Sequence, residues 1–226
     1  MRIKSFKDFN KKFLLVNFRS PKTPILKKVL DAIGFNLTMV TWDEVAKTHL
    51  IEIDGIILSG SPTNLTSTDN DPYMERYSFL KDIEIPILGI CFGHQVLGAV
   101  FGGKINHGEE ISGDVKIDIV EKDPLLVGFP KVITMKEHHT ESVSLPNGFI
   151  LLGKSDSCDN EIMKHAEKDI YGVQFHPEQS GSNGDILLKN FYDICDNNAE
   201  FRSHNLERTT ILGKDVLGEP TGTTIF

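Results

Sequence analysis

Short apolar segments separated by amphipathic ones dominate the first half of the chain. The apolar segments, which are the expected strands, lie at 13–18, 35–41, 53–58 and 85–90. Apolar residues that follow one another without alternation are typical of strands covered on both faces, as in a parallel sheet. Between them we expect a helix that Pro24 opens and Gly34 ends, a short helix over 43–49 and a longer one over 72–83. This order predicts an α/β fold with a doubly wound, mostly parallel sheet and helices on both faces.

The second half of the chain has a different pattern. Val115, Ile117 and Ile119 alternate with mostly polar positions, which is typical of an antiparallel strand with one partly hydrated face. Further strands are expected at 132–135, 149–153, 161–165 and 170–175, and a final amphipathic helix at 185–195. We therefore expect a small antiparallel extension of the sheet.

The two ends of the chain differ from this central domain. Residues 1–12 are polar and basic and are interpreted as a lead-in to a single domain over 13–198. Residues 199–226 contain scattered apolar residues with neither a helical nor a strand period. Two interpretations remain open for this segment: a loose tail, or an arm that docks on a partner or on a second copy of the chain.

Composition narrows the classes of function. The 226 residues suffice for one well-buried α/β domain, and a net charge of −8 makes a nucleic-acid partner unexpected. No segment approaches the roughly 20 apolar residues needed to span a bilayer. The chain has three widely spaced cysteines, an odd number, and begins with no apolar signal segment. Because this is typical of a reducing compartment, we expect a cytoplasmic protein. The sequence has neither a CxxC nor an HExxH pattern, and we expect no metal and no cofactor.

The candidate chemistry begins at Cys91. Glycines stand two residues away on either side, Gly89 and Gly93, between an apolar run and a segment with helical character. Strand, sharp turn and helix around a nucleophile define a nucleophile elbow, here with sulfur in place of the usual serine oxygen. A helix that begins at the nucleophile also favours the thiolate. The alternative is an inert core cysteine, since cysteine is among the most buried residue types.

A second candidate segment ends in His176-Pro177-Glu178. A thiol nucleophile needs a base that takes its proton and a carboxylate that orients the base, and neither needs to be near it in sequence. His176 and Glu178 suit these two roles, and Pro177 fixes the backbone between them. The alternative is an ordinary surface loop after a strand.

A third candidate segment is the turn that follows the strand at 53–58. Gly60, in the run Ser59-Gly60-Ser61-Pro62, can present a backbone N–H to a developing oxyanion together with the N–H of Phe92. By itself this signal is weak, because many strands end in glycine, serine and proline.

Taken together, the three segments resemble the class I, triad-type glutamine amidotransferases. The resemblance covers about residues 13–195 and rests on GICFGHQ (89–95), GVQFHPE (172–178) and SGSP (59–62). It implies a flavodoxin-like α/β fold and the release of ammonia from glutamine through a glutamyl thioester. By similarity, Cys91 is the nucleophile, His176 the base and then the acid, and Glu178 its orienting partner. Gly60 and Phe92 supply the oxyanion N–H groups, and Gln95 helps to bind glutamine. Ser61 departs from the usual Gly-Gly-Pro turn of the family.

A further resemblance concerns the segment 136–149, which is interpreted as a loop. Its His139-x-Glu141-x-Val143 pattern followed by Leu-Pro-Asn-Gly-Phe is similar to the glutaminase part of GMP synthetases. The resemblance places His139 and Glu141 beside the glutamine pocket or the interface with the ammonia acceptor, with Glu141 near the substrate amino group. Since the chain has no ATP-pyrophosphatase motif, a separate synthetase subunit is the expected acceptor.

Three other interpretations stay open at this stage. The chain could hydrolyse γ-glutamyl peptides without passing ammonia on, using the same triad. It could serve as the glutaminase subunit of anthranilate or aminodeoxychorismate synthase, although that family typically has an Arg-Tyr-His-Ser-like segment in place of 136–142. It could also be a catalytically silent regulatory subunit, since fold does not fix function.

Overall fold

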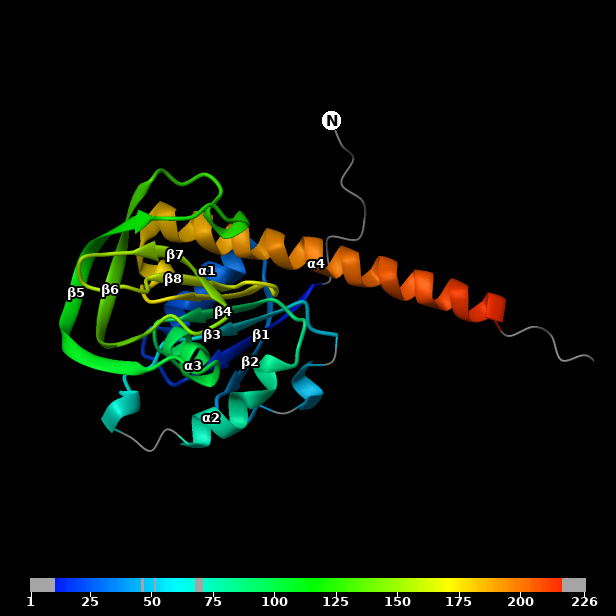
Figure 1. The fold of residues 1–226 in the computed structure, drawn as a ribbon, viewed down its shortest axis with the longest axis horizontal. Helices are drawn as coiled ribbons and strands as arrows, with labels where there is room; N and C mark the ends of the chain where they lie inside the picture. Colours follow the sequence, from blue (N-terminus) through cyan, green and yellow to red (C-terminus); the bar gives the residue numbers. More distant parts are fainter. Residues whose placement is uncertain (1–10, 46, 51, 68–70, 217–226) are drawn as a thin grey trace, which may run out of the picture.

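The molecule is built on one nine-stranded sheet (Figure 1). The computed structural model describes residues 11–45, 47–50, 52–67 and 71–216. The strands follow the spatial order β2-β1-β3-β4-β9-β8-β7-β5-β6. Their bounds are β1 (Lys12–Asn17), β2 (Asn36–Thr41), β3 (Gly55–Leu58), β4 (Ile87–Ile90), β5 (Ile105–Ile119), β6 (Val132–Val143), β7 (Phe149–Lys154), β8 (Ile162–His165) and β9 (Ile170–Val173). From β2 to β9 all neighbouring strands are parallel, and from β9 to β6 all are antiparallel.

Helices cover both faces of the sheet, as the sequence predicted. The α-helices are α1 (Thr23–Ile33), α2 (Asp71–Tyr77), α3 (Phe92–Val100) and α4 (Gly181–Val216). The short 3₁₀ turns are η1 (Lys47–Leu50), η2 (Leu65–Ser67), η3 (Ser78–Lys81), η4 (Pro124–Leu126) and η5 (Pro177–Gln179). One apolar core lies under α1 and α4, with Leu30 and Phe191 fully buried, and the other lies under α2 and α3, with Tyr77 and Val96 fully buried. None of the helices in the described ranges is long and apolar enough to cross a membrane.

The hairpin of β5 and β6 is much longer than the sequence predicted. The strand expected at 115–119 is part of β5, and the one expected at 132–135 is part of β6. The two strands pair from Asp118 opposite Val132 to Ile105 opposite Val143, which is the whole length of β6. The interpretation of 136–143 as a loop was therefore wrong. Alternate residues of this segment do face inward, but three of the inward residues are polar, Glu137, His139 and Glu141. This polarity hides the period-2 pattern that identifies a strand.

The helical segments also differ in part from prediction. The helix expected over 43–49 is a turn at 42–44 and the 3₁₀ turn η1, because so short a segment gains little from helical hydrogen bonds alone. The helix expected over 72–83 is present in two pieces, α2 and η3.

The final helix is longer than expected. The structure continues α4 to Val216, although the sequence showed neither a helical nor a strand period beyond 199. The packed part of α4 nucleates the helix, and no proline or glycine interrupts the chain between Cys195 and Leu212. Residues 1–10 of the predicted lead-in and 217–226 of the predicted tail lie outside the described residues.

Candidate active site

Cys91 occupies a strained turn between β4 and α3. Its backbone has φ 52° and ψ −107°, a left-handed region that non-glycine residues rarely adopt. The glycines around it are required by close contacts: a Cβ at Gly93 would lie 2.4 Å from the Leu58 carbonyl oxygen, and one at Gly89 would lie 2.6 Å from the Gly93 oxygen. The turn therefore has the backbone form of the predicted nucleophile elbow.

His176 and Glu178 follow β9, the parallel neighbour of β4. Since the carboxyl ends of parallel neighbours meet at one edge of the sheet, both residues lie beside Cys91. The His176 Nδ1 atom is 2.8 Å from the Glu178 Oε1 atom, and both side chains are buried. Gly60, at the end of β3, is close to both other groups: a Cβ there would lie 3.2 Å from His176 Cε1 and 3.7 Å from Cys91 Cβ.

The electrostatics of His176 favour its charged form. Burial lowers the pKa of His176, but hydrogen bonding to Cys91 and Glu178 and the charges of both groups outweigh burial and raise this pKa to about 9. The Cys91 thiol donates to the His138 backbone oxygen at 3.8 Å, and Gln174 Nε2 donates to the sulfur at 3.9 Å. The cysteine thus lies in a polar setting, unlike an inert core thiol.

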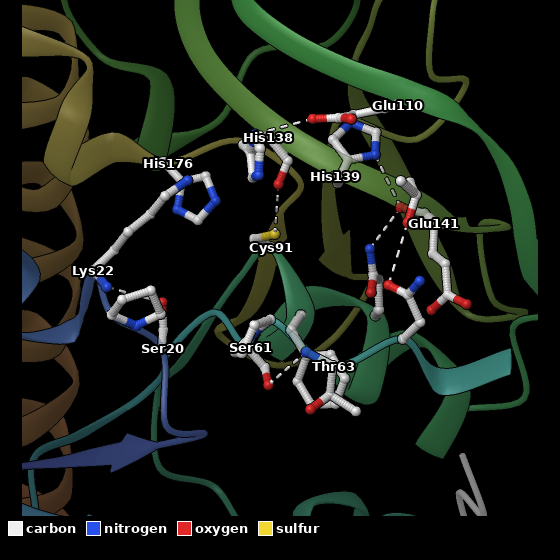
Figure 2. A pocket seen from close by; sticks show the side chains of 16 residues that line it. Ser20, Lys22, Ser61, Thr63, Cys91, Glu110, His138, His139, Glu141 and His176 are labelled. Atoms are coloured by element: carbon white, nitrogen blue, oxygen red, sulfur yellow. Dashed lines mark hydrogen bonds and ion pairs between the residues drawn. The ribbon is translucent and has the colours of Figure 1, made fainter. Parts of the chain in front are cut away.

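These residues line a cavity of about 360 Å³. Figure 2 shows Cys91 at its centre, with His176 on one side, His138 and His139 on the strand above, and Ser61 and Thr63 on the loop below. Phe92 begins α3 directly after the cysteine, and its ring packs against Phe18 at 5.2 Å between centroids. The Ser61 hydroxyl accepts the Thr63 N–H at 3.1 Å, so the departure from the Gly-Gly-Pro turn adds a local hydrogen bond.

The three predicted substrate-binding residues also line the cavity. Gln95 extends from α3, and its Nε2 donates to the Glu141 backbone oxygen at 2.6 Å and to Gln174 Oε1 at 3.2 Å. Glu141 turns its carboxylate towards the loop after β3, where the N–H groups of Leu65 and Thr66 donate to it at 2.6 and 2.9 Å. The structure thus brings Gln95, His139 and Glu141 together with Cys91 and His176. Within the described ranges, no group of three or more histidine, cysteine, aspartate or glutamate residues is arranged to hold a metal ion.

Sequence reasoning missed the buried acidic residues behind His139. The ring contacts Glu137 Oε2 through Nε2 at 2.8 Å and the Glu141 backbone oxygen through Nδ1 at 3.0 Å. Glu137, one of these two partners, is itself fully buried. Alternation along β6 was the one signal that could have found Glu137.

Glu161 is the second buried carboxyl group of this cluster. Burial, and then the charge of Glu137, raise the pKa of Glu161 from 4.5 to about 9, and the Ser155 hydroxyl donates to it at 2.6 Å. Glu161 therefore stays protonated in the folded chain at neutral pH. An oxygen on each of the two carboxyl groups has no protein partner in the described part of the chain, and a shared proton between them satisfies both.

This protonation predicts a pH-dependent stability. A carboxyl whose pKa is raised by folding takes up a proton on folding, so its contribution falls as pH rises from about 4.5 to about 9. Glu161→Gln keeps an acceptor for Ser155 and a donor for Glu137 but does not titrate. Relative to the unchanged protein, the variant should gain about 1.4 kcal/mol of unfolding free energy per pH unit between about pH 5.5 and 8. Urea denaturation at several pH values measures this difference, and parallel stability curves for the two proteins would contradict it.

The fold and the site together define a glutamine amidotransferase of class I. The family model "Glutamine amidotransferase class-I" matches residues 14–195, and the chain belongs to this family. Among individual proteins, the chain is similar to a glutamine-hydrolysing GMP synthase subunit of Methanosarcina acetivorans, with 42% identity over 152 residues, 64% of this chain and 75% of that protein. The protein of the same name from Archaeoglobus fulgidus is 42% identical over 151 residues, 65% of this chain and 79% of that protein.

Two solved structures are similar to this chain. A structure described as a GMP synthase subunit from Thermoplasma acidophilum has a TM-score of 0.77 and 27% identity, covering 85% of this chain and 98% of that one. A glutamine amidotransferase from Thermotoga maritima has a TM-score of 0.64 at 20% identity, covering 84% and 85%, and shares the fold. The predicted family and the predicted doubly wound α/β fold are both confirmed.

Proposed function

We propose that this chain hydrolyses glutamine to glutamate and ammonia, and that the ammonia passes to a separate synthetase subunit that forms GMP. One observation carries the proposal: Cys91, in its strained turn, lines the same cavity as His176, and His176 is paired with the buried Glu178. The similar proteins are named as glutamine-hydrolysing GMP synthase subunits, and these names support a GMP-forming synthetase as the acceptor of the ammonia. The three cysteines of the chain are free thiols, which suits a cytoplasmic location.

In the first half of the proposed reaction, the proton of the Cys91 thiol lies on His176, in a thiolate–imidazolium pair, and the sulfur attacks the side-chain amide carbon of glutamine. The carbonyl oxygen gains the negative charge and accepts hydrogen bonds from the Gly60 and Phe92 N–H groups, each contributing about 3 kcal/mol. His176 then returns the proton to the leaving nitrogen. The carbon–nitrogen bond breaks, ammonia departs and a glutamyl thioester remains on Cys91.

In the second half, His176 takes a proton from a water molecule, and the hydroxide oxygen attacks the thioester carbon. The carbon–sulfur bond breaks, glutamate leaves and the proton returns to the sulfur. Glu178 orients the imidazole throughout, because the Nδ1–H group donates to its carboxylate and leaves Nε2 for the proton transfers. Gln95, which lines the cavity from α3, is proposed to contact the bound glutamine, whereas both ring nitrogens of His139 are engaged within the protein.

The raised pKa of His176 predicts the basic limit of activity. Departure of ammonia needs the imidazolium form, so kcat/KM should fall as pH rises above about 9. Glu178→Gln removes a negative charge that raises the pKa of His176. Burial, which lowers this pKa, is then less opposed, so the basic limb of the pH profile should move to lower pH. We expect kcat at pH 8 to fall by about 10²-fold or more. A pH profile of glutamate release measures both effects. The control Glu121→Gln, which changes an exposed residue, should behave as wild type. A basic limb that does not move in Glu178→Gln would contradict the role of Glu178 as the partner of His176.

The acceptor is tested by reconstitution. The purified chain is mixed with the GMP-forming synthetase subunit of the same source, and GMP formation is measured with glutamine or with an ammonium salt as the nitrogen donor. We expect glutamine to support GMP formation only when this chain is present, and ammonium to support it in either case. Glutamate release without any transfer of nitrogen to GMP would overturn the acceptor and keep the hydrolysis.

A further inference from the structure

The loop from Ser59 to Ser67 forms one wall of the cavity and carries Gly60. It follows β3 and contains a single turn of regular structure, η2. A segment of this kind has few backbone hydrogen bonds of its own, so contacts from other elements must fix its conformation. A Cβ at Gly60 would lie 3.2 Å from His176 Cε1 and 3.7 Å from Cys91 Cβ, so a small displacement of the loop would change the position of the Gly60 N–H group relative to the reacting atoms.

The contacts that fix the loop come from β6, about 75 residues further along the chain. Both carboxylate oxygens of Glu141 are engaged: Oε2 accepts the Leu65 N–H at 2.6 Å, and Oε1 accepts the Thr66 N–H at 2.9 Å. The Thr66 hydroxyl also donates to Oε1. The neighbouring Thr140 hydroxyl donates to Asn64 Oδ1 at 3.2 Å. Figure 2 shows Glu141 reaching from the strand towards this loop.

The backbone of Glu141 joins the same residue to two other walls of the cavity. Its carbonyl oxygen accepts Gln95 Nε2 from α3 at 2.6 Å and the His139 ring at 3.0 Å. The carboxylate is almost completely buried, with 1% of the side chain exposed. A buried carboxylate with three donors on its two oxygens is satisfied within the protein and has little capacity left for a substrate ammonium group.

We propose that Glu141 is a positioning residue for glutamine hydrolysis, whose carboxylate holds the loop 59–67 so that Gly60 stays beside Cys91 and His176. This inference rests on the proposed function. It assigns Glu141 a role different from the contact with the substrate amino group that the sequence predicted. The two roles affect different kinetic constants, because a ligand of the amino group contributes to substrate binding, whereas a support of the oxyanion N–H contributes to the chemical step.

Replacement by glutamine tests the role with little change in shape. In Glu141→Gln the new side chain has one acceptor oxygen, and its NH₂ group must face either the Leu65 N–H or the donors of Thr66, so at least one contact is lost. We expect kcat to fall about 10²-fold, the effect of losing one oxyanion donor, while KM stays within about twofold. Alkylation of Cys91 by iodoacetamide, which needs the thiolate and no oxyanion donor, should proceed at the wild-type rate. Glu109→Gln, exposed on the same hairpin, is the matched control.

A second variant approaches the contact from the loop. Thr66→Val removes the hydroxyl donor and leaves β6 unchanged, so we expect a smaller fall in kcat, about threefold to tenfold. Because both substitutions break one contact, the double variant should be no slower than Glu141→Gln alone. Additive losses in kcat would overturn the proposal, as would a KM that rises tenfold at unchanged kcat in Glu141→Gln, which would make Glu141 a substrate ligand.

A probe that needs no turnover keeps the test independent of a partner subunit. 6-Diazo-5-oxo-L-norleucine is a glutamine-like electrophile whose carbonyl takes the place of the substrate amide, so its reaction with Cys91 uses the oxyanion donors. We expect Glu141→Gln to slow this labelling while iodoacetamide labelling is unchanged, and equal slowing of both would overturn the positioning role. Failure of the proposed function is a separate result: the wild-type chain itself would neither release glutamate nor react with the glutamine-like probe.

Discussion

Glutamate release from glutamine is expected to fall by about 10⁴-fold or more when Cys91 is replaced by alanine. The substitution removes the sulfur that forms the thioester, and among the described residues that line the cavity no other side chain presents a nucleophile at the same point of the turn. The fold should persist, because alanine fits the space of cysteine and brings the same Cβ to the left-handed turn that cysteine already occupies. The loss of one buried sulfur should cost about 1 to 2 kcal/mol of unfolding free energy.

The control is another buried free thiol outside the cavity. Cys158 is buried in the loop between β7 and β8, and its pKa is raised to about 12 by burial and then by the charge of Glu161, so it is a neutral, unreactive thiol. Cys158→Ala should release glutamate at the wild-type rate. Glutamate is measured in a coupled assay and folding by circular dichroism, and appreciable turnover by a folded Cys91→Ala protein would refute thioester chemistry.

The predictable parts of the molecule are those whose constraints are local in sequence. β1, β3 and β4 are buried on both faces, so their residues are apolar almost without interruption and the strands could be found directly. The elbow could be found for a related reason. The strained turn at Cys91 and the close packing on both sides of it admit only glycine at 89 and 93, and this requirement leaves a short spaced pattern in the sequence.

The remaining parts depend on contacts between distant segments. The inward face of β6 contains Glu137, His139 and Glu141, whose partners are one another, a carboxyl in the segment that leads into β8, and the loop after β3. A polar residue that is buried because a distant partner satisfies it looks like a surface residue in the sequence. The sequence therefore predicts a loop for this segment, and the hydrogen bonds of Glu141 with the loop 59–67 cannot be foreseen from it.

Gly184 is another residue whose importance only the folded structure reveals, and Gly184→Ala should be severely destabilising. A Cβ at this position in the first turn of α4 would lie 1.8 Å from the Pro177 carbonyl oxygen and 2.7 Å from its carbon. Both are backbone atoms of the segment that carries His176 and Glu178, so no side-chain rotation can relieve the overlap. Either α4 moves away from the sheet or the segment 176–179 moves away from Cys91.

Each of these movements has a measurable cost. Moving α4 disturbs Leu187 and Phe191, which are fully buried in the core, and moving the segment alters the 2.8 Å contact of His176 with Glu178. We therefore expect the unfolding free energy to fall by about 3 kcal/mol or more. We also expect kcat/KM to fall by about 10²-fold, because a displacement of about 1 Å in a catalytic group has an effect of this size.

Gly108→Ala provides the matched comparison, since a Cβ there would find its nearest neighbour, the Thr140 oxygen, at 4.0 Å. Urea denaturation and steady-state kinetics on the two variants separate steric overlap at Gly184 from a general effect of replacing glycine by alanine. If Gly184→Ala unfolds at the wild-type urea concentration with wild-type kcat/KM, the packing of α4 on Pro177 does not position the histidine and glutamate. A loss of activity with full stability would instead place the whole displacement in the segment 176–179, and would identify the first turn of α4 as the support of the triad.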